Sequence, residues 1–355
     1  LCCYSMEDDR FFAEVQVEPD AKNILKYLAR IEKQQSRDCR IVCGYEAGCL
    51  GYSLYHQLHA HGIDCVILAP TTMMTKPGKR IKTDRRDARL ISKCLAFHTY
   101  SPVYIPTEVD DAVKEYIRMR DDANSALARV KQQIIAFCIR HGKIHDGKSY
   151  WTNKHLEWLS SLDLGNKILS EVLQEYLIRY YQLREQVDMY DMRINELAQA
   201  EPYRQKVEKL GCFRGIAAHT ALSFCVEVGD FRRFATAQQF ASYLGLVPGE
   251  CSSGDKQQYT GITKAGNSHL RKLLVETAQV FGRSATKSGK SVALKERQAK
   301  CDSLTVAYAD KANARLKKKY FKIAMRSKVN IAKTAVAREM ACFIWGMMTD
   351  NISCA

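Results

Sequence analysis

Apolar and polar residues alternate in short blocks over the first ninety residues and then follow a helical period along most of the remaining chain. Short apolar runs bounded by polar turns predict strands, and longer amphipathic stretches predict helices. Strands that alternate with helices are typical of an α/β layer. The predicted strands are 1–5, 11–18, 39–46 and 64–70, and the predicted helices are 20–33 and 50–61.

Long helices are predicted from residue 111 to residue 200. Apolar residues recur there with an alternating spacing of four and three over four heptads, which predicts a coiled-coil seam. The same spacing runs from Ala123 to Phe137, so a second helix with a matching seam is predicted there. The two helices could pair within one chain or between chains, and the spacing does not distinguish these arrangements. The seam positions are 169, 173, 176, 180, 183, 187, 190, 194 and 197.

A basic segment over residues 80–95, RIKTDRRDARLISKCL, carries Asp84 and Asp87 at the start of a predicted helix. Asp84 is expected to cap this helix, and an acidic residue in the first turn complements the helix dipole. Residues three apart also share a helix face, so the two carboxylates could hold a cation between them. The spacing alone favours the capping role.

The composition points to a polyanionic partner. The formal net charge is +15, from 54 Lys and Arg against 39 Asp and Glu, which favours nucleic acid over a membrane. No run of 18 apolar residues is present. The 14 scattered cysteines lack zinc-site spacing and predict reduced, mostly buried thiols in a cytoplasmic protein.

Three later segments suggest contacts with phosphate. A turn at Gly215 resembles a helix-hairpin-helix, although an ordinary helix pair fits it equally well. The segment 243–276 is rich in Gly, Ser and Lys and could hold a nucleophilic serine near phosphate, although its composition is more typical of a surface loop. In the segment 314–328, lysines interleave with Tyr320 and Phe321, as in a phosphate-tracking surface with stacking groups or in a solvated amphipathic helix.

Four segments together resemble the transposases of the insertion sequence 110 family. They are YEAGCLGYSLYHQL (45–58), KTDRRDARLISK (82–93), the long stretch that begins GDFRRF and ends HLRKLLVE (229–276), and AVAREMACFIWGM (335–347). They occur in the family's order and cover nearly the whole chain.

The resemblance implies a recombinase built of two parts joined by a helical coiled-coil arm. The N-terminal part is expected to have an α/β RNase H-like (RuvC-like) fold with a D-E-D-D carboxylate set, in which Glu46 matches the glutamate and Asp84 and Asp87 match the last two aspartates. Hard carboxylate ligands suit Mg2+. The mostly α C-terminal part supplies a serine nucleophile that matches Ser253, with Ser252 as the near alternative. The expected domains are 1–110, 111–204 and 205–348.

The expected partners are donor DNA, target DNA and a structured guide RNA that is encoded by the element and pairs with both DNAs. A homo-oligomer, a dimer or a tetramer, is expected as well. Basic residues and one glycine are the candidate contacts to nucleic acid. They are Lys79, Arg80, Lys82, Arg85, Arg86, Gly215, Lys256, Lys264, Arg271, Lys272, Lys317, Lys318 and Lys319.

One departure from the family pattern affects the expected activity. The family's first catalytic aspartate lies in a glycine-containing strand just before a segment like LCCYS, and this sequence begins at Leu1. The expectation is therefore that one metal ligand is missing and that this chain is defective or inactive in strand transfer. The alternatives are a DNA- or RNA-binding remnant without catalysis and a metal-dependent junction nuclease that uses water as the nucleophile.

Overall fold

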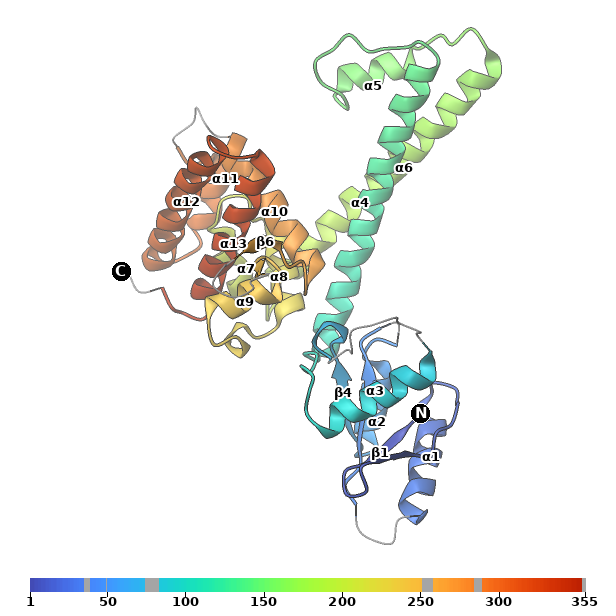
Figure 1. Ribbon diagram of the computed structural model, residues 1–355. Coiled ribbons are helices and arrows are strands. Elements are labelled where there is room, and N and C mark those ends of the chain that lie inside the picture. Colours follow the sequence, from blue (N-terminus) through green and yellow to red (C-terminus); the bar gives the residue numbers. More distant parts are fainter. Residues whose placement is uncertain (35–38, 49, 74–82, 251–257, 284–288, 353–355) are drawn as a thin grey trace. The chain divides into compact units, whose positions relative to one another are not determined.

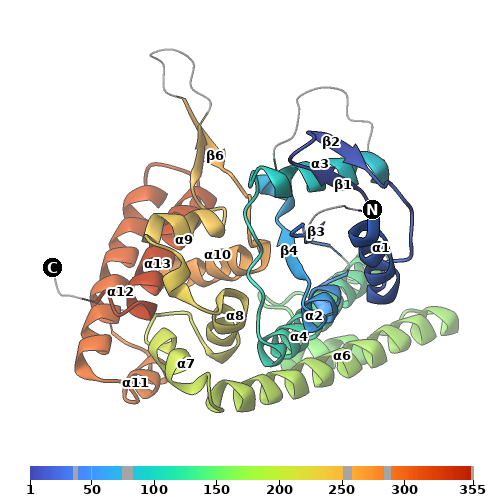
Figure 2. The same ribbon diagram turned by 90° about the horizontal axis from the view of Figure 1, so that it is seen from below.

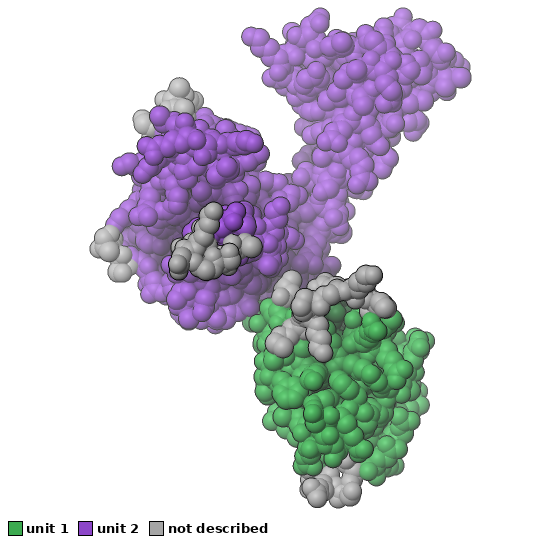
Figure 3. Space-filling model, viewed as in Figure 1, with its two compact units in different colours: residues 1–105 green, residues 106–355 purple. Residues whose placement is uncertain are grey.

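The computed structural model describes residues 1–34, 39–48, 50–73, 83–250, 258–283 and 289–352. The chain forms two compact units, Leu1–Ile105 and Pro106–Ala355, which are coloured separately in Figure 3. No helix within these described ranges is both long and apolar enough to cross a bilayer.

The first unit is an α/β unit, as the alternation of strands and helices predicts. Its two short sheets are an antiparallel pair, β1 with β2, and a parallel pair, β3 with β4. Helix α1 packs on α2 through a small core that includes Ile24, Leu28 and Leu58. The elements are β1 Cys3–Ser5, β2 Arg10–Phe12, α1 Ala21–Gln34, β3 Val42–Glu46, α2 Ser53–Ala60, β4 Asp64–Leu68, the 3-10 turn η1 Pro70–Thr72 and α3 Asp84–Ala96.

The second unit contains two long helices, α4 (Glu108–Arg140) and α6 (Lys167–Gln199), which lie side by side in Figure 1. Buried residues of the predicted seam, such as Leu173 and Tyr180 of α6, share one core with Leu127 and Ile134 of α4. The two helices therefore pack against each other within one chain. Whether they form a coiled coil in the strict sense stays a prediction.

The rest of the second unit is a helical body in which α13 packs against α12, α10 and α9 (Figure 2). A short helix, α5, lies across one end of the α4 and α6 pair (Figure 1). The division of this unit into an arm and a body stays a prediction. Its other elements are α5 Asn153–Ser160, α7 Arg204–Gly211, α8 Ala218–Val228, the 3-10 turn η2 Phe231–Arg233, α9 Ala237–Tyr243, β5 Pro248–Glu250, β6 Tyr259–Ile262, α10 Ser268–Arg283, α11 Val292–Gln298, α12 Ser303–Ala324 and α13 Val329–Met348.

Candidate functional site

Helix α3 approaches strand β3 closely, and Gly44 makes this possible. A Cβ at residue 44 would lie 2.9 Å from side-chain carbons of Leu95 and of Leu68, so no larger residue fits without movement. Glu46 is the last residue of β3 and pairs with Leu68 of β4. The close approach fixes the helix that carries the predicted acidic pair against the strand that carries Glu46.

The start of α3 differs from the prediction in one respect. Thr83, not Asp84, is the N-cap: its backbone is extended and its hydroxyl accepts a hydrogen bond from the Arg86 amide at 3.4 Å. Asp84 and Asp87 both lie in the first turn, where their charges complement the helix dipole. The capping role predicted for Asp84 is wrong, because a threonine directly before it takes that position.

Two guanidinium groups of α3 are held by a carboxylate from the N-terminal segment. Glu14 accepts hydrogen bonds from Arg85 and Arg89, one to each carboxylate oxygen. The hydrogen bonds from Arg89 and Arg85 lower the pKa of Glu14. Arg85 is therefore engaged with Glu14 in this structure, although 72% of its side chain is exposed.

The three predicted metal ligands have suitable chemistry. Carboxylate oxygens suit Mg2+, and Glu46 and Asp87 are half-buried whereas Asp84 is exposed. Among the residues that the structure describes, however, no group of three or more His, Cys, Asp or Glu side chains is placed to hold a metal ion. The arrangement of these carboxylates around an ion therefore stays a prediction.

The predicted serine segment is carried by an antiparallel hairpin, β5 with β6, in the second unit. Ser252, Ser253 and Lys256 lie outside the described residues, but both ends of the segment are fixed. Just outside the two strands, the Thr263 amide donates to the Val247 carbonyl at 2.9 Å and the Asn267 amide donates to the Tyr243 carbonyl at 2.9 Å.

A glycine is required at the base of this hairpin. Gly266 has a φ of +106°, and a Cβ there would overlap the carbonyl oxygen of Tyr243. The two chain segments that lead into and out of the hairpin are thus in direct backbone contact. This contact sets where the hairpin begins.

A cluster of charged side chains lies beside the hairpin base, where α4, α8 and α10 meet. Asp121 of α4 lies 2.9 Å from His219 of α8 and accepts a hydrogen bond from His269 of α10 at 2.8 Å. The other ring nitrogen of His269 lies 3.4 Å from Glu227. Arg118 also donates to Glu227, at 3.0 Å.

Glu227 joins this charged cluster to the hairpin. Its carboxylate accepts a hydrogen bond from Asn267 at 2.9 Å, and its backbone carbonyl accepts one from the Tyr243 hydroxyl at 3.2 Å. Tyr243 precedes β5 and Asn267 follows β6, so one glutamate contacts both ends of the segment that forms the hairpin. Only 6% of the Glu227 side chain is exposed.

The cluster strongly shifts proton affinities. Burial alone would favour neutral side chains, but hydrogen bonds to Asp121 and Glu227, and the charges of both carboxylates, raise the pKa of His269 to about 9. Burial also opposes the charge on Glu227, yet its hydrogen bonds and its proximity to His269 and Arg118 lower its pKa to about 2. The imidazolium and the carboxylates are therefore charged at neutral pH.

The sequence analysis does not identify this cluster. Its two imidazoles and the carboxylates that contact them come from positions 121, 219, 227 and 269, and no local spacing joins them. One signal is present, because Glu227 interrupts the apolar run ALSFCVEVGDF, and a charge in such a run requires a buried partner.

The basic candidates in the second unit differ in their surroundings. Arg271 donates to the Leu244 carbonyl at 2.9 Å, so it also supports the hairpin base, whereas Lys264 and Lys272 are exposed. Gly215 packs against α10, where a Cβ would lie 2.9 Å from the Thr277 methyl group. Lys79, Arg80 and Lys82 lie outside the described residues, and Arg86 is exposed at the start of α3.

Helix α12 is only partly the surface that its sequence predicts. Lys318 is exposed, Lys317 is half-buried, and Lys319 forms an ion pair with Glu339 at 2.6 Å. The stacking role predicted for Tyr320 is wrong, because this ring is 6% exposed and packs against α10 at Gly282. The helical period turns Tyr320 toward the core and leaves Lys318 on the exposed face.

Two stretches of the chain match models of transposases. Residues 1–139 match a model described as "Transposase", of the DEDD type, and residues 208–297 match the model of the "Transposase IS116/IS110/IS902 family". The protein is thus a transposase, an enzyme class that cuts and joins DNA.

Relatives extend the similarity over most of the chain. The chain is 36% identical over 307 residues to the putative transposase y4qE of Sinorhizobium fredii, with 86% of this chain and 75% of the relative covered. It is 32% identical over 314 residues to the transposase for insertion sequence element IS1533 of Leptospira borgpetersenii, with 86% and 88% covered. The chain belongs to the IS110 family of transposases.

Proposed function

We propose that this transposase cuts and joins DNA strands with Ser253 as its nucleophile, and that an RNA encoded by the element guides it to donor and target DNA. Attack by the serine hydroxyl would form an Oγ–P bond and break a P–O bond of the strand, and the hydroxyl proton would pass to the leaving oxygen. The resemblance to the family identifies Ser253. The fixed base of the β5–β6 hairpin supports the proposal, because a nucleophile needs a defined position.

The carboxylates of the first unit are proposed to bind Mg2+. Glu46, Asp84 and Asp87 would hold the ion, which when bound would neutralise phosphate oxygens and the charge that develops during transfer. Two features of this chain favour the assignment. Gly44 allows α3 to pack closely on β3, and Glu14 pairs with Arg85, which lies between the two aspartates in the sequence, and with Arg89. An RNase H-like fold is proposed for this unit on the same family basis.

Assembly into a dimer or tetramer is proposed from the outer face of α6. Ile178, Met189 and Met192 are 43%, 54% and 68% exposed, and they project from the side opposite the seam that packs on α4. A row of large apolar side chains in water is typical of an interaction surface.

The experiment that tests the nucleophile is the capture of a covalent DNA–protein adduct. End-labelled donor or target DNA would be incubated with guide RNA, Mg2+ and protein, and adducts would be resolved under denaturing conditions. The unsubstituted protein and Ser252→Ala are expected to form the adduct, and Ser253→Ala is expected not to form it.

Each other result identifies a different function. Adduct formation by Ser253→Ala with loss in Ser252→Ala would assign the role to Ser252. Cleavage without any adduct in all three proteins would indicate hydrolysis by a junction nuclease. Binding without cleavage would indicate a nucleic-acid-binding protein without catalysis.

A further inference from the structure

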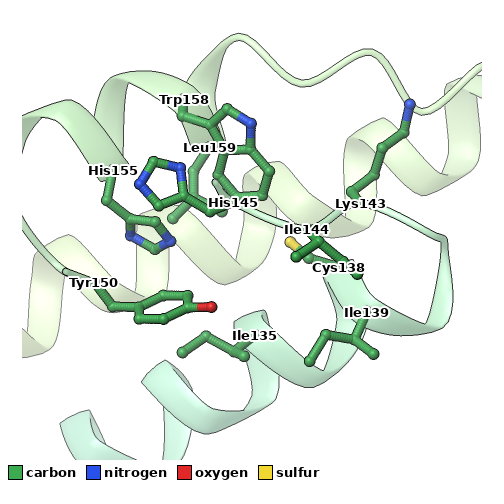
Figure 4. Close-up of a pocket in the computed structure, with 10 residues that line it drawn as sticks. All are labelled: Ile135, Cys138, Ile139, Lys143, Ile144, His145, Tyr150, His155, Trp158 and Leu159. Carbon is green, nitrogen blue, oxygen red and sulfur yellow. The ribbon is translucent and has the colours of Figure 1, made fainter. Parts of the chain in front are cut away.

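A pocket of about 130 Å3 lies at the end of the α4 and α6 pair that carries α5 (Figure 4). Isoleucines of α4 and of the following loop line one side, and ring side chains from the loop and from α5 line the other. Ile139, Ile144 and Tyr150 at this pocket are 58%, 68% and 45% exposed. Such exposed apolar groups around a hollow are typical of a binding site.

The rings form a connected cluster. His145 lies 5.0 Å from the Trp158 ring and 4.8 Å from the His155 ring, and Tyr150 lies 5.0 Å from His155, measured between ring centroids. The loop has a glycine, Gly147, where a Cβ would overlap the His145 ring. The cluster therefore presents flat aromatic surfaces whose positions are set by their neighbours.

His155 supplies a polar group inside this apolar pocket. Its side chain is 1% exposed, and its Nδ1 accepts a hydrogen bond from the Trp151 amide at 3.2 Å. Burial and the nearby His145 lower the pKa of His155, so the ring is neutral and its proton resides on Nε2. Among the residues that the structure describes, none accepts a hydrogen bond from this N–H.

The surroundings of the pocket are positively charged. Between residues 139 and 159 the chain carries four cations, Arg140, Lys143, Lys148 and Lys154, against Asp146 and Glu157. Three of these cations are exposed, and Lys143, which lines the pocket, is half-buried. A partner that carries a negative charge beside a flat ring would satisfy both the charge and the aromatic surfaces.

We propose that this pocket binds an unpaired base of single-stranded nucleic acid, with the adjoining phosphates held by the surrounding lysines and arginine. Base stacking on aromatic side chains within a basic surface is a general mode of single-strand binding, and the His155 N–H matches an acceptor on the edge of a base. A second copy of this chain fits less well, because its own charge of +15 would meet a positive rim. The inference rests on the proposed function, because it adds a nucleic-acid site at the end of the α4 and α6 pair. Its test measures binding alone and needs no recombination.

The test measures the binding of short single-stranded oligonucleotides that contain one 2-aminopurine, in a DNA series and an RNA series. Tyr150→Ala is expected to weaken binding by about 5- to 150-fold, the range for the loss of one base–aromatic stack. The fluorescence change of the bound 2-aminopurine should be lost as well. The series that loses more affinity identifies the natural ligand as DNA or RNA.

Tyr181→Ala is the matched control. Tyr181 is also 45% exposed and lies on α6, outside the pocket, so its replacement should leave oligonucleotide affinity and 2-aminopurine emission unchanged. Lys143→Gln, which leaves the rings in place, should lower the salt dependence of binding by about one phosphate contact. Thermal melting followed by circular dichroism checks that each variant is folded.

Two results would overturn the proposal. One is equal affinity and equal emission in Tyr150→Ala and Tyr181→Ala. The other is a change in oligomeric state, measured by light scattering, in Tyr150→Ala with unchanged oligonucleotide binding, which would identify the pocket as a contact between copies. Failure of the Ser253 adduct experiment would leave the inference standing, since no chemistry enters this measurement.

Discussion

Replacing His269 with glutamine should remove a pH-dependent part of the stability of the second unit. A histidine with a pKa of about 9 in the folded chain and 6.5 in the unfolded chain stabilises the fold by about 3 kcal/mol. Because the folded-state pKa is raised, this contribution is complete below pH 6.5 and is lost as the pH rises through 9. His269→Gln should therefore lower stability by about this amount below pH 6.5 and by much less above pH 9.

The charges of the cluster explain the size of the effect. With His269 protonated, three cations (Arg118, Arg120 and His269) balance three carboxylates. Glutamine can keep one hydrogen bond but leaves the cluster with one uncompensated negative charge beside buried groups. The carboxylates that complete the cluster are Asp121, Asp191 and Glu227.

Urea unfolding followed by the fluorescence of Trp345 measures this effect. Trp345 is in the body of the second unit, where its indole donates to the Phe234 carbonyl at 3.1 Å. Replacing Trp151 and Trp158 with phenylalanine in every protein leaves Trp345 as the reporter, since the chain has three tryptophans.

His141→Gln is the control, because His141 is exposed and pairs with none of the described carboxylates. It should retain the pH dependence of the unsubstituted protein. If His269→Gln and the unsubstituted protein lose equal stability between pH 6.5 and pH 9, the reasoning about the charged cluster is wrong.

Two further substitutions test the elements that carry the candidate sites. Thr83→Ala should destabilise the first turn of α3 by about 1 kcal/mol, whereas Thr83→Ser should not, as measured by hydrogen exchange of α3 peptides; equal protection in both variants would contradict the cap. Gly266→Ala should destabilise the hairpin base by about 2–4 kcal/mol in urea unfolding, because it adds strain at a positive φ and a clash with Tyr243. Gly261→Ala, in the same hairpin with open space around it, should cost far less, and similar losses in both would refute this account.

Local patterns predict most elements of the first unit, although the strand predicted over 11–18 spans only Arg10–Phe12. The predicted strand that ends at Glu46 is observed with that end, and the predicted helix at Asp84 begins at that residue. The helix predicted over 50–61 is shorter and begins at Ser53, after Gly51, which has a φ of +54°. The first residue of a helix is set by the N-cap residue directly before it, which does not belong to the apolar repeat. The apolar pattern therefore predicts helix starts with an error of a few residues.

Long-range contacts account for what the sequence does not predict. Glu227 and His269 are 42 positions apart, and only the packing of α8 on α10 brings their charges together. The pocket at α5 likewise needs the chain to fold back between α4 and α6. In α12, the pattern correctly predicts a helix, but which of its faces is buried depends on α10 and α13.

The contact at Gly44 also acts at a distance. Leu95, which rests on this glycine, is eleven residues from Asp84, or about 16 Å along a helix that behaves as a stiff rod. A side chain at residue 44 would push on one end of that rod and tilt the other. The absence of a side chain at residue 44 therefore sets the orientation of α3, and with it the separation between Glu46 and the acidic first turn of the helix.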